Sequence, residues 1–104
     1  MPAYWMAHAK INNPVEYKRY TDLVPAIIKQ YGGKVLARGG HYKINEGGED
    51  FRQFHRHVVI EFPTMEQAVA CFESKEYQDA AACRRAGGAG VVHNVIVDGG
   101  DATK

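Results

Sequence analysis

The feature that most constrains the fold is the order of two hydrophobic patterns along the chain. Residues 3–11 and 56–62 alternate between two kinds of side chain with a period of two, which is typical of β-strands. Residues 34–38 and 91–97 are predicted as two further strands. Segments with helical spacing of three and four residues lie between them. The chain therefore reads strand, helix, strand, strand, helix, strand.

The first helix is predicted to begin at Asn13, whose side chain can cap it, with Pro14 in the first turn and Glu16 placed to complete a capping box. Pro25 removes a backbone hydrogen bond, so we expect the helix to kink or split there. Gly32 and the glycine after it end the helix. One face of this helix carries an apolar stripe: Tyr17, Tyr20, Val24, Ile27, Ile28 and Tyr31.

The second helical segment begins at Thr64, which opens another capping box with Gln67. Ser74 is predicted to restart the helix after a slight break. Tyr77, Ala80, Ala81 and Arg84 share a face of the restarted helix. The glycines that follow it end a helix rather than open one, so they do not form a phosphate-binding loop.

The connection between the second and third strands is long. Gly39 and Gly40 indicate a bulge or bend, and residues 41–44 are predicted to resume the strand. Residues 49–54 are predicted to be a mobile loop. The aromatic residues Phe51 and Phe54 indicate that this loop docks on the rest of the molecule.

This order predicts an α+β fold of the ferredoxin-like, split βαβ type. The four strands form an antiparallel sheet in the order 4-1-3-2, with both helices on one face. Residues 1–104 form a single domain, of which 98–104 are a polar tail. The uncovered face holds Met6, Val59 and Val95, and burying such a face favours a homodimer through it.

Composition excludes several classes of function. The 104 residues carry a formal net charge of +1, so neither nucleic acid nor an anionic membrane is an expected partner. No apolar run reaches the ~18 residues of a membrane helix, and the first residues do not resemble a signal peptide. A cytoplasmic location is therefore expected. If Cys71 and Cys83 lie on one continuous helix, they are roughly 18 Å apart, which is too far for a disulfide.

Several short motifs resemble one known family. They are Leu36-Ala37-Arg38-Gly39-Gly40, Glu46-Gly47, Val59-Ile60-Glu61-Phe62-Pro63, Ser74-Lys75-Glu76-Tyr77-Gln78 and Arg84. In this order they are similar to the family catalogued as domain of unknown function 1330, over nearly the whole chain. That family is similar to the dimeric α/β-barrel superfamily, which includes antibiotic-biosynthesis monooxygenases, muconolactone isomerases and haem-degrading enzymes. The resemblance implies the fold and a dimer, but no particular reaction.

The first candidate site combines Arg38, Tyr77 and Arg84, which all match positions of the family. Arginine presents a planar fork that suits a carboxylate or phosphate, and a tyrosine can add a hydrogen bond. Together they would hold a small anionic or oxygen-rich molecule between helices and sheet. The alternative is structural: Arg38 pairs with Glu61 or Glu46, and Arg84 binds carbonyls near a helix end.

The second candidate site is a group of histidines. His8 on the first strand is predicted to neighbour His57 on the third, and His93 can join them from the fourth. His55 and Glu61 share the face of His57. Such a group could bind a ligand, relay protons or bind a transition metal. The alternative is that these residues bind no metal and are simply polar side chains, in the dimer barrel or in solvent, that form hydrogen bonds with their neighbours. We prefer this alternative to a metal site.

The third candidate is a pocket walled by aromatic residues over the small residues Ala7 and Ala9. The alternative is that these rings simply form the core. The rings concerned are Tyr4, Trp5, Tyr17, Tyr20, Tyr31 and Phe72.

Three functions follow from these sites. The first is a small enzyme of cofactor-free monooxygenase or isomerase type acting in a pocket between sheet and helices, with catalytic residues unknown. The second is a non-catalytic dimeric module that binds a small organic acid or aromatic metabolite. The third is a structural or interaction domain. No cofactor and no structural metal are predicted. The residues expected to bind a ligand are Arg38, Tyr77, Arg84, Glu61 and His8.

Overall fold

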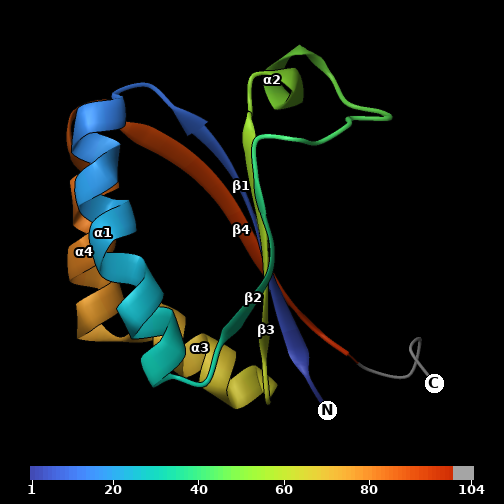
Figure 1. The fold of residues 1–104 in the computed structure, drawn as a ribbon, viewed down its shortest axis with the longest axis vertical. Helices are drawn as coiled ribbons and strands as arrows, with labels where there is room; N and C mark the ends of the chain where they lie inside the picture. The colour runs from blue at the N-terminus through green and yellow to red at the C-terminus, as the bar shows by residue number, and fades with distance from the viewer. Residues whose placement is uncertain (100–104) are drawn as a thin grey trace.

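A computed structural model describes residues 1–99 and shows one four-stranded antiparallel sheet with helices on one face (Figure 1). The sheet order is β2-β3-β1-β4, which is the predicted order read from the other edge. The α+β class and the order of the strands along the chain are confirmed. The strands are β1 (Ala3–Ile11), β2 (Lys34–Gly39), β3 (Arg56–Phe62) and β4 (Gly90–Asp98).

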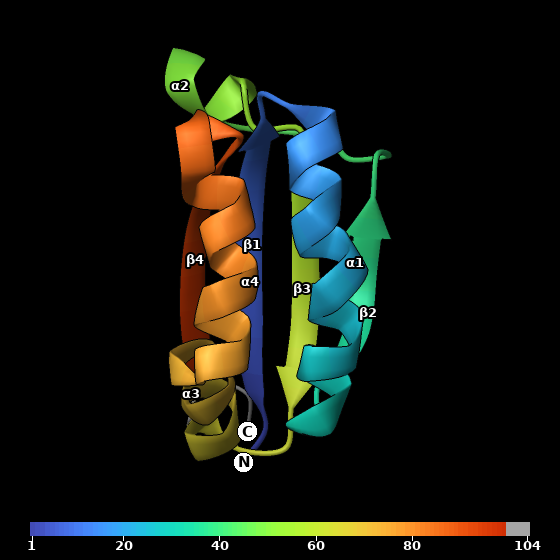
Figure 2. The ribbon, with the colours of Figure 1, turned by 90° about the vertical axis from the view of Figure 1, so that its left-hand side faces the viewer.

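Three helices form the layer that covers the sheet. α1 (Pro14–Gln30) lies over the β3 side, and α4 (Lys75–Arg85) lies beside it over β4 and β1 (Figure 2). α3 (Met65–Glu73) packs at one end of the same layer. The predicted second helix is therefore two helices, with the break at Ser74 as expected.

Side-chain caps explain where these helices begin. At each start, a side-chain oxygen accepts a hydrogen bond from the backbone amide three residues later: Asn13 from Glu16, Thr64 from Gln67 and Ser74 from Tyr77. The three distances are 3.2, 3.1 and 3.1 Å. Pro25 does not split α1, which continues as one helix to Gln30. A proline can be accommodated in this way when the packing of the remaining apolar stripe holds the helix together.

Alternation along the strands divides the sheet into two faces. On β1, Trp5 faces the helices, and its partners in register are Ile60 of β3 and Ile96 of β4. Trp5, Ile60 and Phe62 are buried, as the facing predicted. Met6 lies on the other face, next to Val59 and Val95. We call the covered side the helix face and the other side the open face.

The connection after β2 differs from the prediction. The chain bends at Gly40, as predicted, but residues 41–44 do not resume the strand. The irregularity in the pairing lies earlier, between Val35 and Ala37. Residues 49–54 are not simply a loop, because a short helix, α2 (Glu49–Arg52), forms within them. The whole connection rises over one end of the open face (Figure 1).

This connection docks through its aromatic rings, as predicted. Phe54 is buried, and its ring lies 4.9 Å from that of His93. Phe51 lies 5.3 Å from His8, and Tyr42 lies 4.6 Å from His57, between ring centroids. One end of the open face is thus covered by the chain itself. Within residues 1–99, the other end has no such cover, and Val95 and Val97 there are exposed.

The predicted polar tail lies only partly within the described residues. Asp98 is still part of β4, and the amide of Gly99 donates to the carbonyl of Pro2 at 2.8 Å. Residues 100–104 lie outside the described range.

Candidate functional site

A pocket opens between α1 and the helix face of the sheet. The cavity itself has a volume of about 70 Å³, and the space that includes its open mouth is about 630 Å³. Ala7 and Ala9 lie on its floor, and their small side chains leave the space that larger residues would fill. Its apolar walls are Trp5, Val24, Ile28, Val58, Ile60 and Val92. Apolar walls with a few polar groups are usual for small-molecule sites.

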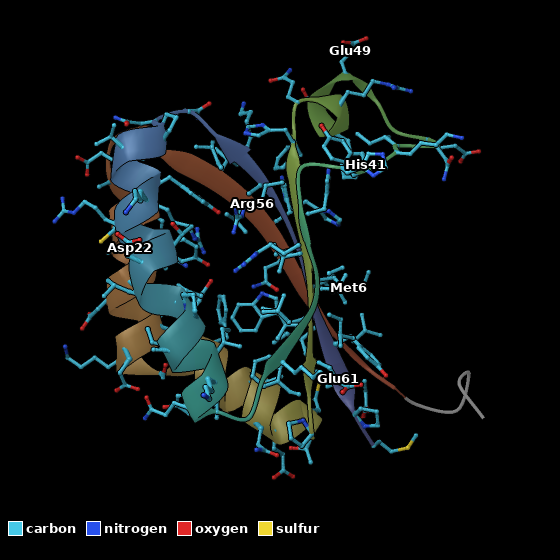
Figure 3. The ribbon with its side chains drawn as sticks, in the orientation of Figure 1. Met6, Asp22, His41, Glu49, Arg56 and Glu61 are labelled. Atoms are coloured by element: carbon cyan, nitrogen blue, oxygen red, sulfur yellow. The ribbon has the colours of Figure 1, made fainter. Side chains whose placement is uncertain are left out.

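Two arginines line this pocket. Arg38 comes from β2 and is paired in register with Val58, and Arg56 precedes Val58 by two residues on β3. Both side chains therefore lie on the helix face of adjacent strands. Figure 3 shows Arg56 in the space between α1 and the sheet. Within residues 1–99 neither arginine forms an ion pair, although both lie beside apolar walls.

Phenols and a third arginine form a buried network next to this pocket. The hydroxyl of Tyr20, which lines the pocket, is 2.8 Å from the hydroxyl of Tyr77. The Nη2 atom of Arg84 donates to the Tyr77 hydroxyl at 3.4 Å, and its guanidinium carbon lies 5.1 Å from the centre of the Tyr20 ring. Tyr77 and Arg84, predicted to act together, are therefore in contact. Arg38 lines the same pocket, but within residues 1–99 it forms no hydrogen bond with either of them.

Burial fixes the protonation of this network. It raises the pKa of the Tyr20 phenol well above 10, and the neighbouring Tyr77 raises it further. Burial disfavours the charged form of Arg84, but the hydrogen bonds and charge interactions with Tyr77 and Tyr20 together outweigh it, so the pKa of Arg84 is raised. At neutral pH the pocket is bordered by a neutral phenol and a permanent cation.

Within the described residues, the structure does not show the contacts that a purely structural role of Arg38 and Arg84 predicted. Arg38 lies on the helix face, while Glu61 lies on the open face (Figure 3). No ion pair joins Arg38 to Glu61 or Glu46 among the described residues. Arg84 binds the Tyr77 hydroxyl and the Tyr20 ring rather than carbonyls at a helix end.

On the open face, three histidines lie in one row across the sheet. His8 is the register partner of both His57 on β3 and His93 on β4. The Nδ1 atoms of His8 and His57 are 2.7 Å apart, so one must donate a proton and the other accept it. Burial lowers the pKa of His8, and the charges of His57 and His93 lower it further. The predicted neighbours are confirmed.

The remaining members of the histidine group do not join this row. Glu61 is paired with Tyr4, four residues along β3 from His57, and His55 bonds to backbone groups of Ile11 and Gln53. Within residues 1–99, no three side chains of the metal-ligating types come close enough together to hold a metal ion. A second pocket, open to solvent and with a cavity volume of about 380 Å³, lies over His8 and His57 beneath Tyr42 and Phe51.

The five predicted ligand-binding residues are thus divided between two places. Arg38, Tyr77 and Arg84 lie at or behind the pocket on the helix face, whereas His8 and Glu61 lie on the open face. The sheet separates the two sets, so they cannot contact one small molecule together.

Sequence reasoning missed two residues on the helix face. Arg56 alternates with Val58 and Ile60, and Asn94 alternates with Val92 and Ile96. The period of two alone would have assigned both to the helix face. Both amide atoms of Asn94 are buried with no hydrogen-bond partner among the described residues.

The aromatic residues of the third candidate site belong mainly to the core, and only some of them line the pocket. Trp5 packs against Phe62, Phe72 and Tyr77, with ring centroids 5.8, 5.7 and 5.1 Å away. Trp5, Tyr17 and Tyr20 also line the pocket. Tyr4 lies on the open face, and the Tyr31 hydroxyl donates to Glu76.

Comparison with known proteins places the chain in a family. The family model described as Domain of unknown function (DUF1330) matches residues 2–100. The chain belongs to this family. No curated protein matches the sequence.

Solved structures show the same fold at low sequence identity. A protein of unknown function from Rhodopseudomonas palustris has a TM-score of 0.70 and 17% identity, over 93% of this chain and 81% of that one. SnoaB, a cofactor-independent oxygenase from Streptomyces nogalater, has a TM-score of 0.61 and 8% identity, over 91% and 89%. A dimeric ferredoxin-like protein from Jannaschia sp. CCS1 has a TM-score of 0.56 and 14% identity, over 91% and 98%. The fold of this DUF1330 chain is ferredoxin-like.

Two further features bear on the class of protein. No helix within residues 1–99 is both long and apolar enough to span a membrane. Cys71 is a free thiol in the core, and burial raises its pKa to about 11, which keeps it protonated.

Proposed function

We propose that this chain binds a small aromatic or similarly apolar molecule that carries an anionic group, in the pocket on the helix face. The observation that supports this proposal is the pair of arginines, Arg38 and Arg56, which border apolar walls without an ion-pair partner among residues 1–99. A guanidinium binds a carboxylate through two parallel hydrogen bonds. The apolar walls suit a ring that follows the carboxylate into the pocket.

The proposed unit is a homodimer of a single domain formed by residues 1–104. The support is the bare end of the open face, where Val95 and Val97 are 52% and 44% exposed, and the edge-strand residue Leu36, which is 48% exposed. Sheet surface of this kind is buried efficiently when two copies pair about a two-fold axis. The Jannaschia protein of the same fold is described as dimeric.

The test of ligand binding uses 4-ethylbenzoate as a probe in isothermal titration calorimetry. The carboxylate is expected to contact the two arginines, whose charged hydrogen bonds are each worth about 1.5–3 kcal/mol. Arg38→Ala and Arg56→Ala should therefore each weaken binding by roughly tenfold or more. The uncharged analogue 4-ethylbenzamide should bind weakly to the wild type for the same reason.

Arg19→Ala is the matched control, because Arg19 is an exposed arginine of α1 that pairs with Glu16 outside the pocket. It should leave binding unchanged. Equal affinity of the wild type and both pocket variants would remove the arginines from the site. No binding of the probe at all would favour a structural or interaction domain.

A second candidate is an enzyme of cofactor-free monooxygenase or isomerase type acting in the same pocket. What favours it is the placement of Arg38, Arg56 and the neutral Tyr20 phenol, because these groups can stabilise a phenol or enol substrate as its anion. An electron-rich anion is also the form that reacts with dioxygen. SnoaB shares the fold and supports this candidate only at that level.

An oxygen electrode distinguishes the two candidates. Consumption of dioxygen by phenolic acids that depends on the protein, and that is lost in Arg38→Ala, would support the enzyme. Binding without any turnover would support the binding module.

A further inference from the structure

Two side chains on the helix face have buried polar atoms that the described part of the chain leaves without partners. Neither Nδ2 nor Oδ1 of Asn94 has a hydrogen-bond partner, and the Nε of Arg84 also lacks one. Arg84 as a whole is 5% exposed. The layer between helices and sheet therefore holds two unpartnered donor nitrogens, Asn94 Nδ2 and Arg84 Nε, and one unpartnered acceptor oxygen, Asn94 Oδ1.

Leaving such groups unpaired is unfavourable. A buried donor or acceptor without a partner costs roughly 1–3 kcal/mol, and buried polar side chains nearly always have one. Asn94 also stands where its neighbours of the same face, Val92 and Ile96, are apolar. An apolar residue would fit this position with less cost. A hydrogen-bond partner for the polar atoms of Asn94 must therefore come from outside residues 1–99.

Both groups lie next to residues that line the proposed ligand pocket, although neither is itself part of the lining. Asn94 is the register partner of Ala7, which lies on the floor of the pocket. The guanidinium of Arg84 lies over the ring of Tyr20, which lines the pocket as well. α4, which carries Arg84, covers β4 and β1, the strands of Asn94 and Ala7 (Figure 2).

We infer that Asn94 and Arg84 form a second, inner subsite, which binds an oxygen-bearing group at the end of the ligand opposite to its carboxylate. A hydroxyl group matches these atoms, because it can donate to the Asn94 oxygen and accept from Arg84 or the Asn94 amide. The inference rests on the proposed function. It narrows the ligand to an aromatic acid that carries a hydroxyl group distant from its carboxylate.

The test uses two probes of the same shape, 4-(hydroxymethyl)benzoate and 4-ethylbenzoate, which differ only by a hydroxyl in place of a methyl group. The wild type should bind the hydroxyl probe roughly tenfold more tightly. Asn94→Leu removes the amide at similar size and should abolish this preference. Asn94→Val provides the same test with a residue that suits a strand better, should leucine prevent folding.

A second measurement separates ligand recognition from a structural role. Replacing an unpaired buried amide by an apolar residue should leave the melting temperature of the free protein unchanged or raise it. Asn45→Leu, the same change in the connection over the open face, should leave the preference between probes intact.

The outcomes are distinct. A preference in the wild type that is lost in both Asn94 variants without loss of stability supports the inner subsite. Equal binding of the two probes to the wild type, or a preference that survives in the variants, overturns it and leaves the proposed function standing. A lost preference with a large fall in melting temperature also overturns it, because Asn94 is then structural. Binding of neither probe overturns the proposed function, and the subsite with it.

Discussion

The two faces of the sheet are built from alternate residues of the same strands, yet they differ in almost every physical respect. On β3, Arg56 lies on the helix face between apolar walls, and the next residue, His57, lies on the open face in a row of imidazoles. Figure 3 shows the same division, with Arg56 on one side and Met6 and Glu61 on the other. A displacement of one residue in register would exchange the two faces. The comparison shows that strand register, more than composition, decides where a ligand can bind.

The open face is itself divided, which the alternation alone does not indicate. Phe51, Phe54 and Tyr42 cover the row of histidines at one end. The end around Met6 and Val95 has no such cover from the described part of the chain. We therefore assign ligand binding to the helix face and pairing with a second copy to the bare end of the open face.

The largest difference between the faces should appear in stability. Trp5→Ala removes a ring that is 2% exposed and packs against three other rings. We expect the free energy of unfolding to fall by roughly 3–5 kcal/mol, as for other large-to-small changes in a core. Urea denaturation followed by circular dichroism measures it.

Met6→Ala is the paired variant, since Met6 is the next residue on β1 but lies on the open face. At concentrations where the protein is monomeric, its cost should be roughly 1 kcal/mol or less. Similar losses in the two variants would show that the faces are not distinct in this way.

A smaller effect, confined to assembly, should follow from a charge on the bare end of the open face. Val95→Asp places a carboxylate where the second copy would bury it, which costs about 2–3 kcal/mol. The dissociation constant of the dimer should rise roughly a hundredfold. Analytical ultracentrifugation over a concentration series measures this, and binding of 4-ethylbenzoate should persist.

Leu23→Asp is the control, because Leu23 is 50% exposed on the outer surface of α1. It should not change the association. If Val95→Asp and the wild type sediment alike as dimers, the second copy binds elsewhere.

The smallest effect concerns pH and the covered end of the open face. Burial and the two neighbouring histidines lower the pKa of His8 from 6.5, so the unfolded chain takes up a proton that the folded chain does not. The resulting stability is present above pH 6.5 and is lost as the pH falls through the range between the unfolded and folded values. Thermal melts between pH 5 and 8 should show this decline.

His8→Asn should flatten the decline, whereas His41→Asn should not, because His41 is exposed and lies outside the row. A profile that is the same for wild type and His8→Asn would assign the pH dependence to other groups.

Local patterns predicted most of the fold. The alternation of residues 3–11 gave both the strand and its buried face, and the oxygens of Asn13, Thr64 and Ser74 marked the helix starts that the structure shows. These features depend on interactions between residues close in sequence. The sequence could therefore reveal them without knowledge of the tertiary structure.

What could not be predicted depends on residues distant in sequence. Residues 49–54 include the short helix α2, and the ring of Phe51 lies against those of His8 and His57, which are distant in sequence. The period of two places Arg56 and Asn94 on the helix face, but which residues lie beside them there depends on strand pairing between residues distant in sequence.

The central claim is that a small aromatic anion binds on the helix face. Nuclear magnetic resonance of the isotope-labelled protein, titrated with 4-(hydroxymethyl)benzoate, tests it most directly. The account predicts that the amide signals of residues around the pocket shift, among them Tyr20, Ile28 and Val58, while those of Tyr42 and Phe51 do not. Shifts that gather instead around Tyr42, Phe51 and His57 would place the ligand on the open face and contradict it.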